Sequence, residues 1–315
     1  YSNDSTASID TTVQEKNITF PTDSKLHRKI IDKCRNIAEK ENLPVRQSYT
    51  RTLKKLSLDQ RFRNHPRNKW KARKADRKEK TIAGRLVREL ERNLSPDSRY
   101  QSDIDLFKRI LNQKKSDKNK IYSVHEPDVQ CISKGKEHKK YEFGNKVSII
   151  YTQTTGVIIG ALGFRNPYDG HTIEPALEQT ERLLGKRTLK TLIGDRGYKG
   201  KRQINDTTIE IPKPFNNRKQ SQYQQNKLKK QFRKRAAIEP INGHLKTDHR
   251  LNRNFYKGIT GDNINVMLAA AAFNFKRMMN KWKSSFGLEF KIQIVDLIKA
   301  MFYQINNNII RKWAF

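Results

Sequence analysis

The spacing of apolar residues changes along the chain and divides it into two kinds of predicted structure. Between residues 7 and 20, apolar side chains alternate loosely with polar ones until Pro21, which predicts one or two short strands. Over residues 24–118 apolar side chains recur at helical intervals, beginning with the run from Leu26 to Ala38. Thr22 or Asp23 could cap the first of these helices. The chain therefore begins with a short strand region followed by a helical unit.

Beyond residue 140 the pattern changes to that of an α/β protein. Short apolar runs with strand character alternate with helical segments, and a Gly ends the first of these helices. The predicted order is a hairpin over 143–164, a helix over 173–184, strands over 189–193 and 207–211, and a helix over 220–247. Residues 264–275 are apolar nearly all round, which predicts a buried helix, and 292–305 predict a last one.

The net charge of the chain indicates what kind of molecule it binds. The 315 residues include 66 Lys and Arg against 32 Asp and Glu, a formal net charge of +34, which argues against an ordinary metabolic enzyme. A field of this strength attracts polyanions, so a nucleic acid is the expected partner. The densest segment, from Arg46 to Lys80, has 14 basic residues against three acids, with Phe62 and Trp70 interleaved as stacking or packing groups. A solvated helical face is the alternative interpretation of this segment. A second run, Arg218 to Arg235, has eight basic residues and no acid.

Other features of the sequence exclude membrane-spanning proteins, secreted proteins and proteins with a cysteine-bound metal. The longest apolar stretch, Val266 to Phe273, is far too short to span a bilayer, and no signal segment is visible, so we expect a cytoplasmic protein without membrane contact. Cys34 and Cys131 lack metal-binding spacing, and we expect both to be reduced structural thiols. Because the chain opens at Tyr1 rather than Met, we expect that it is a fragment and that a further domain precedes it.

Three acidic residues are candidates for metal-dependent phosphodiester chemistry, which needs carboxylates that converge on rigid elements. Asp195 follows an apolar strand and precedes Arg196-Gly197, although it could simply cap a turn. Asp10 stands inside a short apolar strand, where surface alternation explains it about as well. Glu239 lies in a helix where a salt bridge to Arg235 is the ordinary explanation.

The spacing around Glu239 adds a resemblance. Phe232, Arg235, Glu239 and Lys246 match the pattern Y-(2)-R-(3)-E-(6)-K, with Phe in place of Tyr. Together with Ile9-Asp10-Thr11-Thr12-Val13 and the run from Gly194 to Gly200, these residues make the chain similar to bacterial insertion-sequence transposases of the DDE type. The resemblance runs through nearly the whole chain, with three separated motifs in the family's order.

The resemblance implies an α/β fold, a ribonuclease H-like mixed sheet flanked by helices, with a basic helical insertion after the first strand region and C-terminal helices. Asp10, Asp195 and Glu239 would be the catalytic residues and would bind two Mg²⁺ ions, for which Mn²⁺ would substitute. Arg235, Lys246, Arg196 and Phe232 would contact DNA, and Lys246 is the expected direct contact with the DNA end. The corresponding division is 1–23 for the first catalytic strand, 24–118 for the insertion, 119–258 for the remaining core and 259–315 for the C-terminal helices.

Some residues depart from the family pattern or compete for its roles. Pro240 directly after Glu239 predicts a kink. Asp195 and Glu239 are only 44 positions apart, which excludes a large domain inserted between them. Phe232 lacks the hydroxyl of tyrosine. Three other acids compete with Asp10 as the first metal ligand: Asp103, Asp105 and Asp128. The histidines have weaker claims to a catalytic or metal-binding role. His171 suits a helix-start turn and His125 a loop, and the spacing of His244 and His249 is poor for binding a metal.

We therefore expect a transposase that cuts double-stranded DNA at its element's ends and joins the freed 3′-hydroxyl to target DNA. Synapsis of two ends implies a homodimer on DNA, and the host would be a bacterium, with the protein associated with its nucleoid. Two alternatives remain: a nuclease of the same fold that does not transfer strands, and a decayed, non-catalytic, basic DNA-binding protein.

Overall fold

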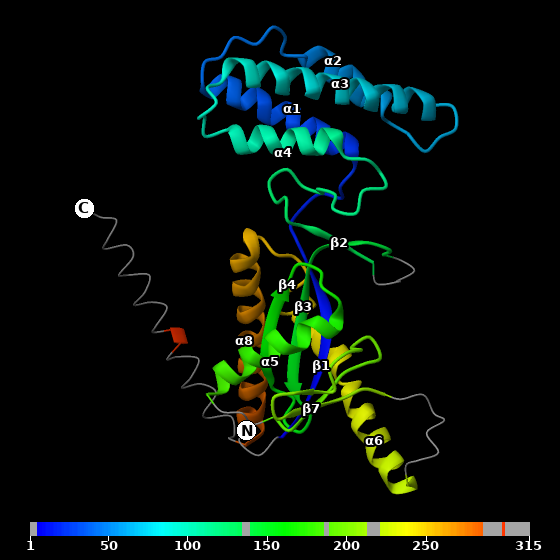
Figure 1. Cartoon of the computed structure of the whole chain (residues 1–315), viewed down its shortest axis with the longest axis vertical. Helices are drawn as coiled ribbons and strands as arrows, with labels where there is room; N and C mark the ends of the chain where they lie inside the picture. The colour runs from blue at the N-terminus through cyan, green and yellow to red at the C-terminus, as the bar shows by residue number, and fades with distance from the viewer. Residues whose placement is uncertain (1–4, 134–138, 186–188, 213–220, 286–297, 300–315) are drawn as a thin grey trace, which may run out of the picture.

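A mixed β-sheet with helices on both faces forms one part of the molecule, and four further helices lie beyond one end of the sheet (Figure 1). The computed structural model describes residues 5–133, 139–185, 189–212, 221–285 and 298–299. Within those ranges the mixed sheet flanked by helices confirms the expected fold class at the level of a mixed α/β architecture.

The sheet mixes antiparallel and parallel pairing. Its strands run in the order β2-β3-β1-β5-β7-β6. Strand β4 is not on this path and also pairs with β3. The pairs β1–β3, β3–β4, β2–β3 and β6–β7 are antiparallel, whereas β1–β5 and β5–β7 are parallel. This arrangement is compatible with a ribonuclease H-like core. The bounds are β1 Thr6–Glu15, β2 Gln130–Ile132, β3 Glu142–Thr152, β4 Ile158–Phe164, β5 Thr191–Ile193, β6 Gln203–Ile204 and β7 Thr207–Glu210.

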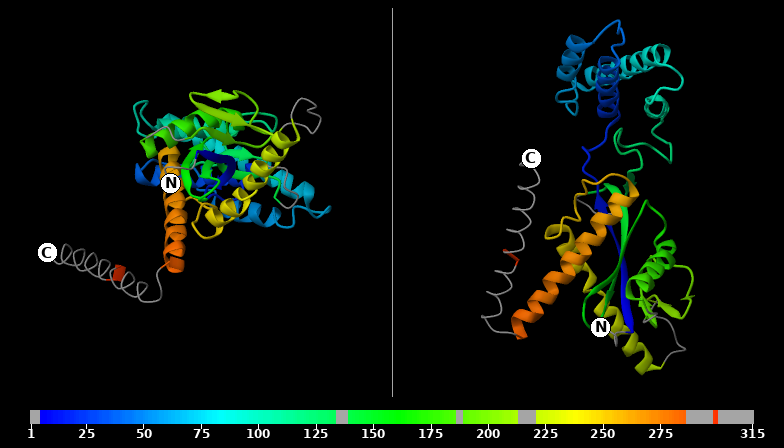
Figure 2. Two further views of the ribbon diagram at one scale, coloured as in Figure 1. Left: turned by 90° about the horizontal axis from the view of Figure 1, so that it is seen from below. Right: turned by 90° about the vertical axis from the view of Figure 1, so that its left-hand side faces the viewer.

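Both faces of the sheet are covered, as Figure 2 shows for α5 (Ile173–Leu184) and α8 (Gly258–Ser285). On one face Ile9 and Ile150 pack against α5. On the other, Ile149 packs against α8 and against α7 (Ile238–Thr247). Because side chains alternate along a strand, neighbouring residues of β1 point to opposite faces. Every second residue of β1 thus faces α7.

The helical part comes between β1 and β2 in the chain and buries an apolar core of its own. Its helices are α1 (Asp23–Lys40), α2 (Thr50–Asp59), α3 (Lys69–Asn93) and α4 (Gln101–Asn112). Their apolar faces meet in one cluster that includes Ile30, Leu86 and Phe107. The hydroxyl of Thr22 accepts a hydrogen bond from the Lys25 amide, so Thr22 is the N-cap of α1.

The predicted helix over 220–247 is two helices, α6 (Gln222–Arg235) and α7, separated at Ala236 and Ala237. Pro240 stands in the first turn of α7, where its missing N–H has no intrahelical partner to lose. The Tyr151 hydroxyl donates to the carbonyl oxygens of Lys234 and Arg235 at 2.9 and 3.1 Å. The break predicted from Pro240 therefore lies three to four residues before it. There Tyr151 of β3 binds carbonyl oxygens at the end of α6.

The prediction that residues 264–275 form a fully buried helix is wrong. They lie within α8, whose one face, with Val266 and Phe273, packs on the sheet. Ile264 and Leu268 are 46% and 56% exposed, because no described element covers the other face. Two short strands, β2 and β6, were not predicted. The predicted helix over 292–305 falls almost wholly outside the described residues.

Candidate active site

Asp10 lies in the middle of β1 and faces α7. It pairs across the ladder with Ile149, whose side chain packs against α7 and α8, so the Asp10 side chain points to that face of the sheet. Asn242 of α7 donates a hydrogen bond to Oδ2 of Asp10 at 3.1 Å, and the Asp10 side chain remains 20% exposed. The strand thus presents a partly buried carboxylate to the helix that carries Glu239.

Asp195 begins the tight turn that follows β5. The Gly197 amide donates to Oδ1 of Asp195 at 2.7 Å, and the Tyr198 amide donates to the Asp195 carbonyl at 3.2 Å. A side-chain carboxylate that accepts from the amide two residues later stabilises such a turn. Because β1 and β5 are parallel neighbours, the turn lies at the end of the strand beside β1.

The register of β1 and β5 brings Asp10 and Asp195 near the same level of the sheet, because Ser8 pairs with Ile193 and each acid follows two residues later. The turn that carries Asp195 continues into Tyr198. The side chain of Tyr198 is completely buried. Burial raises the pKa of the Tyr198 phenol well above 10, and the charges of Asp10, Asp169 and Asp195 raise this pKa further. The phenol is therefore neutral at physiological pH, and its ring belongs to the apolar core that packs against α5.

Asp169, at the start of the short helix η1 (Asp169–Thr172), is a further acid of this site. Thr11 donates to its Oδ1 at 3.0 Å, and Nζ of Lys146 lies 3.0 Å from the same atom. A Cβ added to Gly197 would lie 2.9 Å from Oδ1 of Asp195 and 3.3 Å from Oδ2 of Asp169, so a side chain at this position would displace the Asp195 carboxylate. In the sequence Asp169 belongs to a helix-start turn, and nothing in its spacing distinguished it.

Glu239 stands in the first turn of α7, and its side chain is exposed. Asn242, the residue bound to Asp10, follows one turn later on the same side of the helix. Among the described residues, no ion pair joins Glu239 to Arg235; Nη1 of Arg235 instead lies 4.0 Å from Oδ1 of Asp10. A cation beside Asp10 offsets the cost of keeping that carboxylate partly buried.

The donor atoms suit a divalent cation, although no set of three or more Asp, Glu, His or Cys residues within the described ranges is gathered closely enough to hold one. The carboxylates of Asp10 and Asp195 are hard oxygen donors of the kind that Mg²⁺ prefers. Beside them, Oδ1 of Asn242 is buried and accepts no hydrogen bond from any described residue. An unsatisfied buried oxygen next to Asp10 fits a site completed by water or a hydrated ion.

The four residues expected to contact DNA occupy different environments. Arg196 is exposed on the turn after Asp195, and Phe232 is half-buried on α6. Arg235 is 24% exposed beside Asp10. Lys246 lies 3.9 Å from Oε1 of the buried Glu142. Arg235 and Lys246 thus each lie beside a carboxylate of the protein.

The competing acids lie apart from this cluster. Asp103 and Asp105 belong to α4 in the helical part, and Asp103 pairs with Lys33 at 3.5 Å. Asp128 pairs with Arg165 at 2.9 Å, with both side chains 58% exposed. Each therefore has a local structural role outside the Asp10–Asp195 cluster.

The histidines have local partners too. The contacts are His125 with Ser123, His171 with the Tyr168 ring, His244 with Asp248, and His249 with the Phe273 ring. None of these contacts involves Asp10, Asp195 or Glu239. His171 in η1 and His125 in a loop agree with their interpretation as turn and loop residues, whereas His244 belongs to α7.

The chain has been compared with known proteins. Residues 121–275 match the family model described as "Transposase DDE domain". An uncharacterized protein of Rhizobium meliloti, named ORF8 in the nfe locus, is 42% identical over 59 residues, which are 19% of this chain. The aligned part spans 28% of that relative's length. No solved structure matches the chain.

Proposed function

Residues 121–275 belong to the transposase DDE domain family, and from this premise we propose that the protein is a transposase that cuts DNA at its element's ends and joins the freed 3′-hydroxyl to target DNA. Asp195 and Glu239 lie inside the matched segment, whereas Asp10 lies before it. The tertiary structure joins them, because β1 pairs with both β3 and β5 of that segment.

The observation that carries the proposal is the parallel register of β1 and β5, in which Ser8 pairs with Ile193 and Asp10 and Asp195 each follow two residues later. Asp10 on β1, Asp195 just after the neighbouring parallel strand and Glu239 one helical turn from the residue bound to Asp10 would supply the carboxylates that metal-dependent phosphodiester chemistry uses. Asp10, Asp195 and Glu239 would hold Mg²⁺, or Mn²⁺ in its place. When bound, two such ions activate the attacking hydroxyl and stabilise charge on the phosphate.

The other residues of the site position the acids and the DNA. Asn242 holds the Asp10 carboxylate, and the Asp195 turn holds its own acid at the sheet edge. Arg235 and Phe232 on α6, Lys246 on α7 and Arg196 in the turn after Asp195 would contact the DNA end. Arg235 beside Asp10 would move its charge toward the DNA phosphate, where a cation stabilises developing negative charge. Two DNA ends held together require a homodimer on DNA.

The test is an assay of cleavage and joining. The donor is a linear duplex that carries the gene with its own genomic flanks, and a supercoiled plasmid is the target, with Mg²⁺, Mn²⁺ or EDTA. Asp10→Asn, Asp195→Asn and Glu239→Gln should each abolish both cleavage and joining while DNA binding persists. Asp128→Asn removes an exposed acid and is the matched control, which should remain active.

Each outcome separates the proposal from its rivals. Metal-dependent joined products that the three variants lose support a transposase. Metal-dependent cleavage that never yields joined products would identify a nuclease instead. Binding without metal-dependent cleavage, unchanged by Asp195→Asn, would identify a non-catalytic DNA-binding protein.

A further inference from the structure

Helix α3 carries a line of exposed cations along the side opposite its buried face. Its buried residues, among them Ala75, Ile82 and Leu86, pack into the core of the helical part. The opposite side carries exposed residues at intervals of three or four, which places them on one face of the helix. We call this set the α3 stripe: Trp70, Lys74, Arg77, Thr81, Arg85, Arg88 and Arg92.

The cations of the α3 stripe are not committed to ion pairs. None of Lys74, Arg77, Arg85, Arg88 and Arg92 pairs with an acid among the residues that the structure describes. Cations spaced in this way repel one another unless an external anion lies among them. The stripe is thus a positive surface without an internal counterion.

The acids of α3 are neutralised elsewhere. Glu79 is fully buried and binds Arg28, and Asp76 binds Arg63 at 2.7 Å, both toward the interior of the helical part. Of the acids near the C-terminal end, Glu91 pairs with Lys108, and Glu89 accepts from the Arg46 amide at 2.9 Å. The fold therefore uses its acids away from the stripe and leaves the cations of the stripe at the surface.

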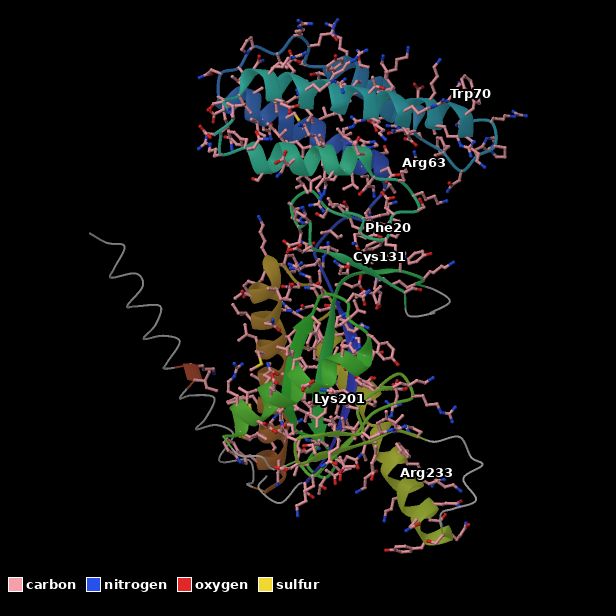
Figure 3. The ribbon with its side chains drawn as sticks, in the orientation of Figure 1. Phe20, Arg63, Trp70, Cys131, Lys201 and Arg233 are labelled. Carbon is pink, nitrogen blue, oxygen red and sulfur yellow. The ribbon has the colours of Figure 1, made fainter. Side chains whose placement is uncertain are left out.

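Two exposed aromatic side chains precede the cations of the stripe in the chain. Trp70 is 60% exposed and Phe62, in the turn before α3, is 79% exposed. Figure 3 shows Trp70 at the outer end of α3, at the edge of the helical part. Phe62 has a φ of +51°, a left-handed conformation that costs a non-glycine residue roughly 1–2 kcal/mol. Neither ring is buried in the core, and the turn displays an aromatic residue at a conformational cost.

The length of the stripe matches a turn of duplex DNA. At about 1.5 Å per residue, Trp70 and Arg92 lie roughly 33 Å apart along the helix axis. One turn of B-form DNA is about 34 Å long. Regularly spaced cations along that distance can follow the phosphates, and an aromatic ring at the end can contact sugars or bases.

We propose that the α3 stripe binds the backbone of double-stranded DNA over about one helical turn, with Phe62 and Trp70 contacting the adjoining groove. This surface belongs to a part of the chain that the family match does not include. The proposal rests on the proposed function only in that the DNA would be the substrate of the same protein. Binding at the stripe requires neither the acids of the active site nor a metal ion.

The test measures binding of the full chain to a labelled duplex about two helical turns long, by fluorescence anisotropy at several salt concentrations in EDTA. The double variant Arg85→Gln/Arg88→Gln should bind roughly tenfold more weakly at about 0.1 M salt. Its log–log salt slope should fall by about 2, because each lost phosphate contact releases one counterion fewer. Lys115→Gln/Lys118→Gln, which removes the same charge from the exposed loop after α4, is the control and should match the unaltered chain.

A second comparison tests the aromatic residues. Trp70→Ala should weaken binding without changing the salt slope, because stacking releases no counterions. Phe62→Gly should weaken binding but should not lower the urea midpoint of the free chain, since glycine adopts positive φ without strain. A merely structural Phe62 would instead give a lower urea midpoint and unchanged binding, which would remove it from the surface.

Two results would overturn the proposal. In the first, the Arg85/Arg88 variant binds like its charge-matched control, so that only the overall charge of the chain attracts DNA. In the second, single-stranded DNA or RNA of equal length binds more tightly than the duplex and depends on the same arginines. Because EDTA suppresses catalysis, both results are independent of the cleavage assay.

Discussion

The side-chain amide of Asn242 donates a hydrogen bond to Oδ2 of Asp10 across 3.1 Å, joining α7 to the middle of β1. The two residues are 232 positions apart in the sequence. This contact orients the Asp10 carboxylate from the helix that also carries Glu239. It makes Asn242 a positioning residue of the proposed active site.

Replacing Asn242 by Ala should reduce cleavage about 10- to 100-fold, the usual effect of losing a residue that orients a metal ligand. The divalent-ion concentration for half-maximal cleavage should rise, whereas affinity for duplex DNA in EDTA should stay the same. Asn263→Ala, which also removes an asparagine amide bound to the protein, is the control for stability. A variant with unchanged metal dependence would contradict the positioning role.

A buried ionic cluster holds the end of β1 against α8. Nζ of Lys16 lies 3.0 Å from Glu126 and 2.5 Å from Asp262, and all three side chains are less than 9% exposed. Lys16→Met should lower the free energy of unfolding by about 3–5 kcal/mol, because it leaves two buried carboxylates without their cation. Urea denaturation measures the change.

The exposed pair Arg165–Asp128 is the control for that measurement. Arg165→Gln should cost about 0–1 kcal/mol, since solvent screens an exposed ion pair. Equal losses for the two variants would show that the Lys16 cluster is not buried in solution.

Two glycines should respond in opposite directions to Ala. A Cβ on Gly144 would overlap the Gln14 carbonyl on the neighbouring strand, so Gly144→Ala should lower the free energy of unfolding by about 1–3 kcal/mol. No atom lies within 4 Å of a Cβ on Gly243, which lies inside α7. Gly243→Ala should stabilise the chain by about 0.5–1 kcal/mol. Thermal or urea unfolding that ranks them in reverse would contradict the β1–β3 register.

The two cysteines should differ in reactivity. Cys34 is 1% exposed, and burial followed by the charge of Asp103 raises the pKa of its thiol to about 12, whereas Cys131 is half-buried. Iodoacetamide at neutral pH should therefore label Cys131 before Cys34 in the folded chain, and both in urea. Mass spectrometry of the labelled peptides measures the order, with Cys131→Ser as the control.

The same pKa predicts the effect of alkaline pH. Because the pKa of Cys34 is higher in the folded than in the unfolded chain, the neutral thiol contributes stability that is complete below about pH 9. That contribution declines as the pH rises toward 12. Cys34→Ala should flatten the stability profile over this interval, and an unchanged profile would exclude the thiol as its cause.

Helical periodicity predicted α1, α3, α4 and α5 because each of these helices has one continuous apolar face. The strands β2 and β6 were missed because three and two residues carry too little pattern, and their pairing depends on β3 and β7. The apolar run in α8 was taken for a buried helix. The composition of a helix does not show which of its faces packs against the sheet, and in α8 only one face does.

The positions of Asp10, Asp195 and Glu239 could be proposed from motif spacing, because spacing is a property of the chain. Asp169 and Asn242 could not, because their partners Thr11 and Asp10 are brought to them by strand pairing and helix packing. The sequence also does not specify that Phe62 and Trp70 are exposed, since an interleaved aromatic suits a core as well as a surface.

The sequence by itself determined the charge of the protein, the type of most of its helices and strands and the acids worth testing, because these depend on local composition and periodicity. Only the tertiary structure decided which acids meet, which cations remain without a protein anion and which helix faces stay exposed. These outcomes depend on contacts between residues more than a hundred positions apart. The local preferences of a segment for helix or strand do not determine which distant segments it packs against.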